Sequence, residues 1–282
     1  MPLSPLLRAA LLMSAGMCFI PMGDTAGKLL GGAGVEPVFI AWSRFGLGAI
    51  LVWAAFGGRG FDLRVFFDWR YWARAVLITV AVTCILTALK TEPIATVFAA
   101  FFVGPILSYF LAAWLLRERI TVARTILLFL GFCGVLLVVK PGVEASGGLG
   151  WALFAGMLYG CFLVATKWLS GTVNPRSLLV SHLAIGALLL TPWGVSAMPE
   201  ASGTTAILVL ASAAASATGN LLYTIATRMA DASRLAPLVY VQLVSATVMG
   251  IAVFGDWPDG WSLAGLALLL GSGFGAFFVQ RR

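Results

Sequence analysis

Apolar residues follow one another along this chain in long blocks, without the regular alternation of apolar and polar positions that marks a half-buried β-strand. Each block is about 20 residues long, the length of α-helix needed to cross a hydrocarbon core of about 30 Å. Because the strands of a transmembrane barrel would alternate, the blocks predict membrane-spanning helices. The ten expected spans lie at about residues 7–30, 37–56, 72–90, 94–116, 122–140, 149–169, 177–195, 204–227, 233–254 and 261–279.

The composition agrees with this pattern and excludes several classes of protein. Of the 282 residues, 61% are hydrophobic and 10% are charged, whereas soluble domains average roughly 45–50% apolar and about 25% charged residues. A cytosolic enzyme, a disordered protein and a secreted disulfide scaffold are therefore excluded. The longest connection between spans lies at about residues 57–71, so no loop can hold a soluble domain. We predict an all-α polytopic membrane protein that works inside the membrane or at its faces.

Lysine and arginine determine the expected orientation. Fourteen of the 18 basic residues lie at or near the face that would carry both termini, three lie at the opposite face, and Arg44 lies inside a span. This bias predicts cytoplasmic N- and C-termini, and we expect the bacterial inner (cell) membrane as the location. We interpret the first block as a span rather than a cleaved signal sequence, because no soluble domain follows it.

Few residues offer metal, redox or nucleic-acid chemistry. The net charge is +7, but the basic residues are spread among apolar segments, so we expect no nucleic-acid partner. The four cysteines form no CxxC pair and there is a single histidine, so we expect neither a metal site nor a cofactor. The expected partners are a small-molecule solute and the lipid bilayer, with the protein acting as a monomer or a homodimer.

The two halves of the chain resemble each other, which suggests a duplication of five spans. At an offset of 139 residues the halves share an A-x-K-x-L sequence around Lys28 and Lys167. Because five is odd, the second set enters the membrane from the opposite face, so the repeats at 7–140 and 149–279 are inverted. Exchanging the conformations of inverted repeats converts an inward-open carrier into an outward-open one. At an offset of 138 the coinciding pairs are Arg44 with His182, Lys90 with Arg228 and Glu118 with Asp256.

Together with the two lysine motifs, two further stretches carry a family resemblance. Trp42-Ser43-Arg44-Phe45 in the second span, and Gly104-Pro105 through Leu115-Leu116-Arg117-Glu118-Arg119 at the end of the fourth, resemble the drug/metabolite transporter superfamily, the EamA family in particular. The resemblance implies a ten-helix secondary carrier with a central cavity for amino-acid-like, nucleoside-like or vitamin-like metabolites. The second repeat departs from the family pattern, with Gly255-Asp256 for Gly-Glu and His182 for arginine.

Charged side chains inside the spans are candidates for function, because they are costly at membrane depth. Asp24 and Lys28 are spaced i, i+4 on one helix face. Asp24 could bind an amine or titrate as the group that couples transport to protons, and Lys28 could attract an anion, or the two could form an internal ion pair. Arg44 could contact substrate or clamp helix-end carbonyls or Asp24. His182 could titrate near neutral pH or simply be hydrogen-bonded between helices.

Uncharged polar and aromatic side chains complete the candidate site. We expect the cavity between spans one, four, six, eight and nine. The alternative for the polar and aromatic residues of these spans is that they only pack the helices together. The candidate substrate-binding residues from these spans, besides Asp24 and Lys28, are Phe98, Phe102, Tyr159, Asn220, Tyr223, Tyr240 and Gln242.

These observations favour a secondary active carrier that works by alternating access of the two repeats. The balance of Lys28 and Arg44 against Asp24 favours a zwitterionic or weakly anionic solute, with protons as a candidate coupling ion. A multidrug or organic-cation exporter of the same fold is the alternative. An intramembrane enzyme is remote, because the sequence holds no HExxH and no GxSG with a distant histidine.

Overall fold

The computed structural model describes residues 4–57, 61–117, 120–140, 147–169, 171–200, 202–229 and 236–279. In this part of the chain seven helices are long and apolar enough to cross a membrane, and three shorter apolar helices accompany them. The all-helical, ten-span fold is therefore confirmed. In chain order the helical elements are α1 (Pro5–Gly32), α2 (Pro37–Ala55), η1 (Leu63–Phe66), α3 (Trp69–Ala88), α4 (Ile94–Phe101), α5 (Val103–Leu116), α6 (Val122–Val139), α7 (Gly147–Trp168), α8 (Pro175–Ser196), α9 (Gly203–Met229), η2 (Ala236–Tyr240), α11 (Val241–Met249), η3 (Gly250–Phe254) and α12 (Gly260–Val279).

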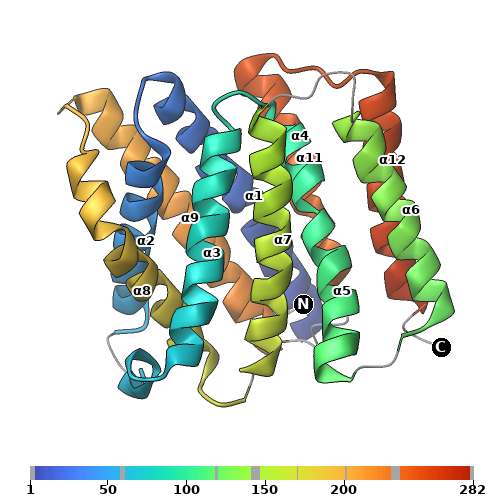
Figure 1. Ribbon diagram of the computed structural model, residues 1–282, viewed down its shortest axis with the longest axis horizontal. Helices are drawn as coiled ribbons and strands as arrows, with labels where there is room; N and C mark the ends of the chain where they lie inside the picture. Colours follow the sequence, from blue (N-terminus) through green and yellow to red (C-terminus); the bar gives the residue numbers. More distant parts are fainter. Residues whose placement is uncertain are drawn as a thin grey trace.

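α1 begins and α12 finishes at the same end of the helical bundle (Figure 1). We call the end where α1 begins and α12 finishes the N-terminal face, and the other end the opposite face. The connection between α3 and α4 and the one between η3 and α12 both lie at the opposite face. The stretch that joins α2 to α3 lies at the N-terminal face.

Proline begins the second helix of each set of five. Pro37 and Pro175 occupy the first turn of α2 and α8, where the missing N–H costs no helical hydrogen bond. In α8 the Asn174 side chain caps the helix by accepting a hydrogen bond from the Ser177 backbone N–H at 2.9 Å. The two prolines are 138 residues apart, so the helix starts agree with the offset found in the sequence.

The fourth helix of each set is interrupted, although the sequence predicts continuous spans at 94–116 and 233–254. A turn at Phe102 separates α4 from α5, and Pro105 lacks the N–H that would reach the Phe101 carbonyl. In the second set η2, α11 and a π-helical turn, η3, follow one another. The two interrupted helices end alike, because Arg117 and Gly255 both have positive φ, of 55° and 71°, and are 138 residues apart.

The contacts between helices also match between the two sets of five. α1 packs on α9 as α7 packs on α3, and α2 packs on α9 as α8 packs on α3. α7 also packs on α5, and α1 on α11. Two further large contacts join equivalent helices, α2 with α8 and α6 with α12, and Figure 1 shows α6 and α12 side by side at one edge of the bundle. At that edge a Cβ added to Gly134 would lie 2.7 Å from the Gly265 carbonyl oxygen. The fifth helices are thus held together by close glycine packing.

The centre of the bundle is formed around α4. Almost every residue of this short helix is buried, from Ile94 through Phe101, and its side chains belong to the main apolar core. α4 contacts α7 and α11. Its aromatic side chains therefore face the elements that the sequence analysis assigns to a central cavity.

Candidate functional site

A buried ion pair joins three helices near the opposite-face half of the bundle. Arg44 Nη1 on α2 donates to Asp24 Oδ1 on α1 at 2.5 Å, and its Nε donates to Ser212 Oγ on α9 at 2.6 Å. The side chains of Arg44 and Asp24 are only 7% and 6% exposed. We call Asp24, Arg44 and Ser212 the ionic centre. It neutralises a carboxylate and a guanidinium that would each be costly to bury alone.

The local sequence of α1 makes room for this pair. The Gly23 carbonyl accepts hydrogen bonds from Arg44 Nη2 at 2.5 Å and from Ser212 Oγ at 3.0 Å. A Cβ at Gly27 would lie 2.5 Å from Arg44 Nη2, so glycine is required where the guanidinium lies against the helix. Arg44 is therefore in the clamp arrangement that was one of two alternatives for it, while a contact with substrate stays a prediction.

The structure does not join Asp24 to Lys28, and the internal pair considered for them is wrong because each has another partner. Lys28 Nζ donates to the Glu92 carbonyl oxygen at 2.8 Å and pairs with Asp256 at 3.3 Å. The same nitrogen lies 4.7 Å from the centre of the Phe254 ring. We call Lys28, Glu92 and Asp256 the opposite-face latch, since it ties α1 to the starts of α4 and α12.

Aromatic rings form a continuous series from α4 to α7. The ring centres of Phe98 and Phe101 are 6.5 Å apart, those of Phe101 and Tyr159 are 4.5 Å apart, and those of Tyr159 and Phe162 are 5.9 Å apart. All three spacings fall within the range of about 4.5–7 Å in which aromatic pairs attract. We call these four residues the aromatic series. Separately, Phe102 stacks on Tyr240 at 5.1 Å.

Three further candidate residues, Asn220, Tyr223 and Gln242, lie on α9 and α11. Asn220 donates to the Ser216 carbonyl of its own helix at 2.8 Å, which leaves its amide only partly available to a solute. Tyr223 is 40% exposed on α9, and Gln242 is buried on α11. Their contact with substrate stays a prediction, as does that of Phe98, Phe102, Tyr159 and Tyr240.

His182 lies at the far end of the aromatic series, next to a buried arginine. Its ring centre is 5.9 Å from that of Phe162, and its Nδ1 lies 3.2 Å from the Leu178 carbonyl oxygen. Arg74 also lies against Phe162, with its Cζ 4.6 Å from the ring centre. We call Arg74, Phe162 and His182 the arginine cluster. From the sequence alone Arg74 contributes only to the charge bias, although its place 138 residues before Ser212 is a signal that could have singled it out.

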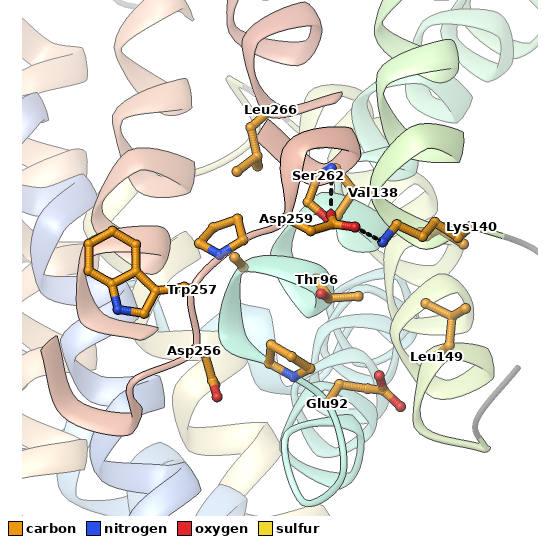
Figure 2. A pocket seen from close by; sticks show the side chains of 14 residues that line it. Glu92, Thr96, Val138, Lys140, Leu149, Asp256, Trp257, Asp259, Ser262 and Leu266 are labelled. Atoms are coloured by element: carbon orange, nitrogen blue, oxygen red, sulfur yellow. Dashed lines mark hydrogen bonds and ion pairs between the residues drawn. The ribbon is translucent and has the colours of Figure 1, made fainter. Parts of the chain in front are cut away.

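A pocket of about 330 Å³ opens beside the opposite-face latch. Figure 2 shows Asp256 and Glu92 at one end of it and Asp259 with Lys140 at the other. Lys140 and the Ser262 side chain and N–H hold the pKa of the Asp259 carboxyl below its ordinary value, with the hydrogen bond from Lys140 as the largest cause. The lining is completed by Pro93, Ala95, Thr96, Val138, Val139, Leu149, Trp257, Pro258, Ser262 and Leu266.

The family of the chain follows from comparison with known proteins. The model of the EamA-like transporter family matches residues 7–140 and 146–278. The chain belongs to the EamA-like transporter family. Membership confirms the resemblance seen in the sequence, and makes the chain an integral membrane protein of a family of transporters rather than of enzymes.

Curated relatives within the EamA-like transporter family carry the names of metabolite transporters. A riboflavin transporter of Rhizobium johnstonii is 28% identical over 228 residues, which cover 78% of this chain and 72% of that protein. An S-adenosylmethionine uptake transporter of Rickettsia prowazekii is 22% identical over 200 residues, covering 70% and 67%. A solved crystal structure with 19% identity, covering 97% of this chain and 98% of its own, has a TM-score of 0.71 and shows the same fold. These relatives support a small-metabolite transporter.

Proposed function

We propose that the protein is a secondary carrier for a small metabolite that contains a planar aromatic ring, of the nucleoside-like or vitamin-like kind. The aromatic series carries this proposal. Phe98 and Phe101 come from the fourth helix of one set of five, and Tyr159 and Phe162 from the first helix of the other. Aromatic rings that meet between the two sets are the kind of surface on which a planar solute can stack in turn.

The names of the relatives agree with a ring-bearing solute. Riboflavin and S-adenosylmethionine, which their names give as solutes, differ in charge but both contain a planar nitrogen heterocycle. An aromatic surface recognises this shared feature without regard to net charge. An organic-cation exporter would instead need a free carboxylate at membrane depth, and Asp24, the one carboxylate inside the expected spans, is paired with Arg44.

The mechanism that we propose is alternating access by two inverted repeats, 7–140 and 149–279, with both termini in the cytoplasm of a bacterial inner membrane. The paired helix contacts and the paired helix ends support this inversion. The opposite-face latch would be one of the contacts that break when the carrier opens to that face. Breaking it exposes Lys28 and Asp256, which are already partly exposed at 17% and 31%.

Proton coupling, if present, would act through the ionic centre. A proton on Asp24 removes the charge that holds Arg44 and frees α2 and α9 to move relative to α1. The Asp24→Asn variant mimics the protonated form. It should insert and fold with reduced stability but lose the pH dependence of transport. Transport with an unchanged pH profile would show that Asp24 is not the coupling group.

The test of function is counterflow in proteoliposomes. Purified protein is reconstituted with excess unlabelled riboflavin inside, and entry of labelled riboflavin is followed with S-adenosylmethionine, nucleosides, amino acids and ethidium as competitors. Tyr159→Leu should weaken the apparent affinity of ring-bearing solutes about two- to tenfold, since an aromatic pair contributes about 0.5–1.5 kcal/mol. Phe129→Leu is the matched control, because Phe129 is 58% exposed on the outside of α6. Counterflow with amino acids or ethidium but with no ring-bearing metabolite would overturn the proposal.

A further inference from the structure

The arginine cluster lies at the three-helix junction that corresponds to the ionic centre in the other half of the chain. Adding 138 to Arg44 gives residue 182, and subtracting 138 from Ser212 gives residue 74. In the first helices, where Lys28 and Lys167 are 139 residues apart, Asp24 corresponds to residue 163, the neighbour of Phe162. The three residues of the ionic centre meet between α1, α2 and α9. In the other half Phe162, His182 and Arg74 meet between α7, α8 and α3. The same three-helix junction therefore exists twice, once toward each face of the bundle.

The chemistry of the two junctions differs in one respect that matters for binding. In the ionic centre the guanidinium has a carboxylate partner. In the arginine cluster the guanidinium lies against the ring of Phe162 instead. Arg74 Nε donates to Thr166 Oγ1 at 2.8 Å and Nη1 donates to the Leu178 carbonyl oxygen at 2.9 Å, and among the described residues Nη2 makes no hydrogen bond and no ion pair includes Arg74.

Arg74 does not reach out to water as arginines near a membrane surface often do. The residue is only 4% exposed. One turn earlier on α3, the side chain of Arg70 is 38% exposed and pairs with Asp68. A buried guanidinium is normally compensated by an anion. The chain supplies such an anion to Arg44, and to Arg70 at the surface, but among the described residues not to Arg74.

We propose that the arginine cluster is a binding site for an anionic group, a carboxylate or a phosphate, attached to the ring of a transported solute. This proposal rests on the proposed function only for the ring. Phe162 is both the last member of the aromatic series and the cover of the guanidinium. A solute whose ring follows the series to Phe162 brings its anionic group to Arg74. Displacement of the Phe162 side chain would admit that group next to the guanidinium, as Asp24 lies next to Arg44 in the ionic centre.

The site lies in the half of the bundle toward the N-terminal face. Arg74 is five residues from the start of α3 at Trp69, and His182 is seven from the start of α8 at Pro175. His182 lies beside the same Leu178 carbonyl that accepts from Arg74. Because Nε and Nη1 of Arg74 already have partners, Nη2 is the guanidinium nitrogen that can donate to an oxygen of the anionic group.

The experiment measures binding rather than transport, so its result does not depend on whether riboflavin is the solute. Thermal unfolding of the purified protein in neutral detergent is followed with nicotinate and with nicotinamide, which share a ring and differ in charge. Nicotinate should bind at least about tenfold more tightly than nicotinamide, because bonds to a charged partner are the stronger ones. Equal effects of the two compounds, or no effect of either, would overturn the proposal.

Three variants separate the site from general electrostatic effects. Arg74→Gln should remove the preference for nicotinate, and Arg70→Gln, which deletes the same charge one turn away, should keep it. Phe162→Glu gives Arg74 a carboxylate of its own, so this variant should unfold at a temperature no lower than the wild type and should not respond to nicotinate. A full response of Phe162→Glu to nicotinate would contradict the assignment.

A lipid headgroup is the other source of an anionic group at this depth. Short-chain phosphatidylglycerol is therefore added in place of nicotinate, and in competition with it. A soluble solute site predicts that nicotinate stabilises the protein in the absence of any phospholipid. Stabilisation by phosphatidylglycerol alone, lost in Arg74→Gln, would identify a lipid site instead and refute the proposal.

Discussion

Removing the negative charge of the ionic centre should destabilise the protein strongly. In Asp24→Asn the amide oxygen can still accept a hydrogen bond, so the change is mainly the loss of charge opposite Arg44. Both side chains are less than a tenth exposed. Breaking a buried ion pair by removing one partner costs about 3–5 kcal/mol, because the other charge stays buried. We expect a loss of that order in the free energy of unfolding.

The matched control is the same substitution at an exposed pair. Asp68 pairs with Arg70 at 2.6 Å, but their side chains are 26% and 38% exposed. Exposed pairs contribute about 0–1 kcal/mol, and asparagine caps a helix about as well as aspartate. Asp68→Asn should therefore cost at most about 1 kcal/mol. The difference between the two variants reflects burial of the charge rather than the substitution itself.

Unfolding by sodium dodecyl sulfate in mixed micelles is the assay, with fluorescence of the ten tryptophans as the signal. The double variant Asp24→Asn/Arg44→Gln should recover part of the loss, since it removes the uncompensated guanidinium. Coupled pairs usually show interaction energies of about 0.5–3 kcal/mol. If Asp24→Asn is no more destabilising than Asp68→Asn, or if the double variant is as unstable as the sum of its parts, the ionic centre does not hold these helices together.

Three further predictions follow from other parts of the structure. Gly134→Val should lower the unfolding free energy by about 1–3 kcal/mol through overpacking, because its Cβ would meet the Gly265 carbonyl. Gly271 has open space beside it, so Gly271→Ala should change the unfolding free energy little. Equal effects of the two substitutions in the same assay would refute the glycine contact. The lowered pKa of Asp259 means that the carboxylate stabilises the folded protein fully above its ordinary pKa of 3.8 and progressively less as the pH falls below that value. The difference in unfolding temperature between wild type and Asp259→Asn should therefore be constant from neutral pH down to about 5 and shrink in stronger acid. A difference that grows in acid would contradict the predicted direction of the pH effect. Lys28→Ala should loosen the opposite-face latch. A membrane-impermeant thiol reagent should then label a cysteine introduced at Thr96, in the pocket, more readily than it does with Lys28 present. Unchanged labelling would show that Lys28 does not close this face.

The sequence by itself determines the membrane helices and their number. Runs of apolar residues long enough to cross a bilayer leave the backbone no alternative to helix, since every N–H and C=O must be satisfied within the segment. The offset of 138 residues also anticipates structural detail, because Pro37 and Pro175 begin equivalent helices. Proline suits the first turn of a helix on local grounds, because its missing N–H costs no hydrogen bond there, although Pro21 and Pro192 lie inside α1 and α8.

Only the tertiary structure decides which charges meet. By spacing, Asp24 and Lys28 share a helix face, yet Asp24 pairs with Arg44 and Lys28 with Asp256. Neither partner can be read from the neighbouring residues, because each lies on a helix or loop that packing brings close. The turn at Phe102, by contrast, has a local cause, because Pro105 lacks the N–H that would reach the Phe101 carbonyl.

Arg74 shows most clearly which features the sequence determines and which the tertiary structure decides. The sequence places Arg74 near the end of a span, where a positive charge indicates only the orientation of the protein. The fold turns the side chain inward, covers it with Phe162 and leaves it without a carboxylate among the described residues. Local sequence determines where a charge enters the membrane, whereas the packing of α3 against α7 and α8 determines what that charge faces.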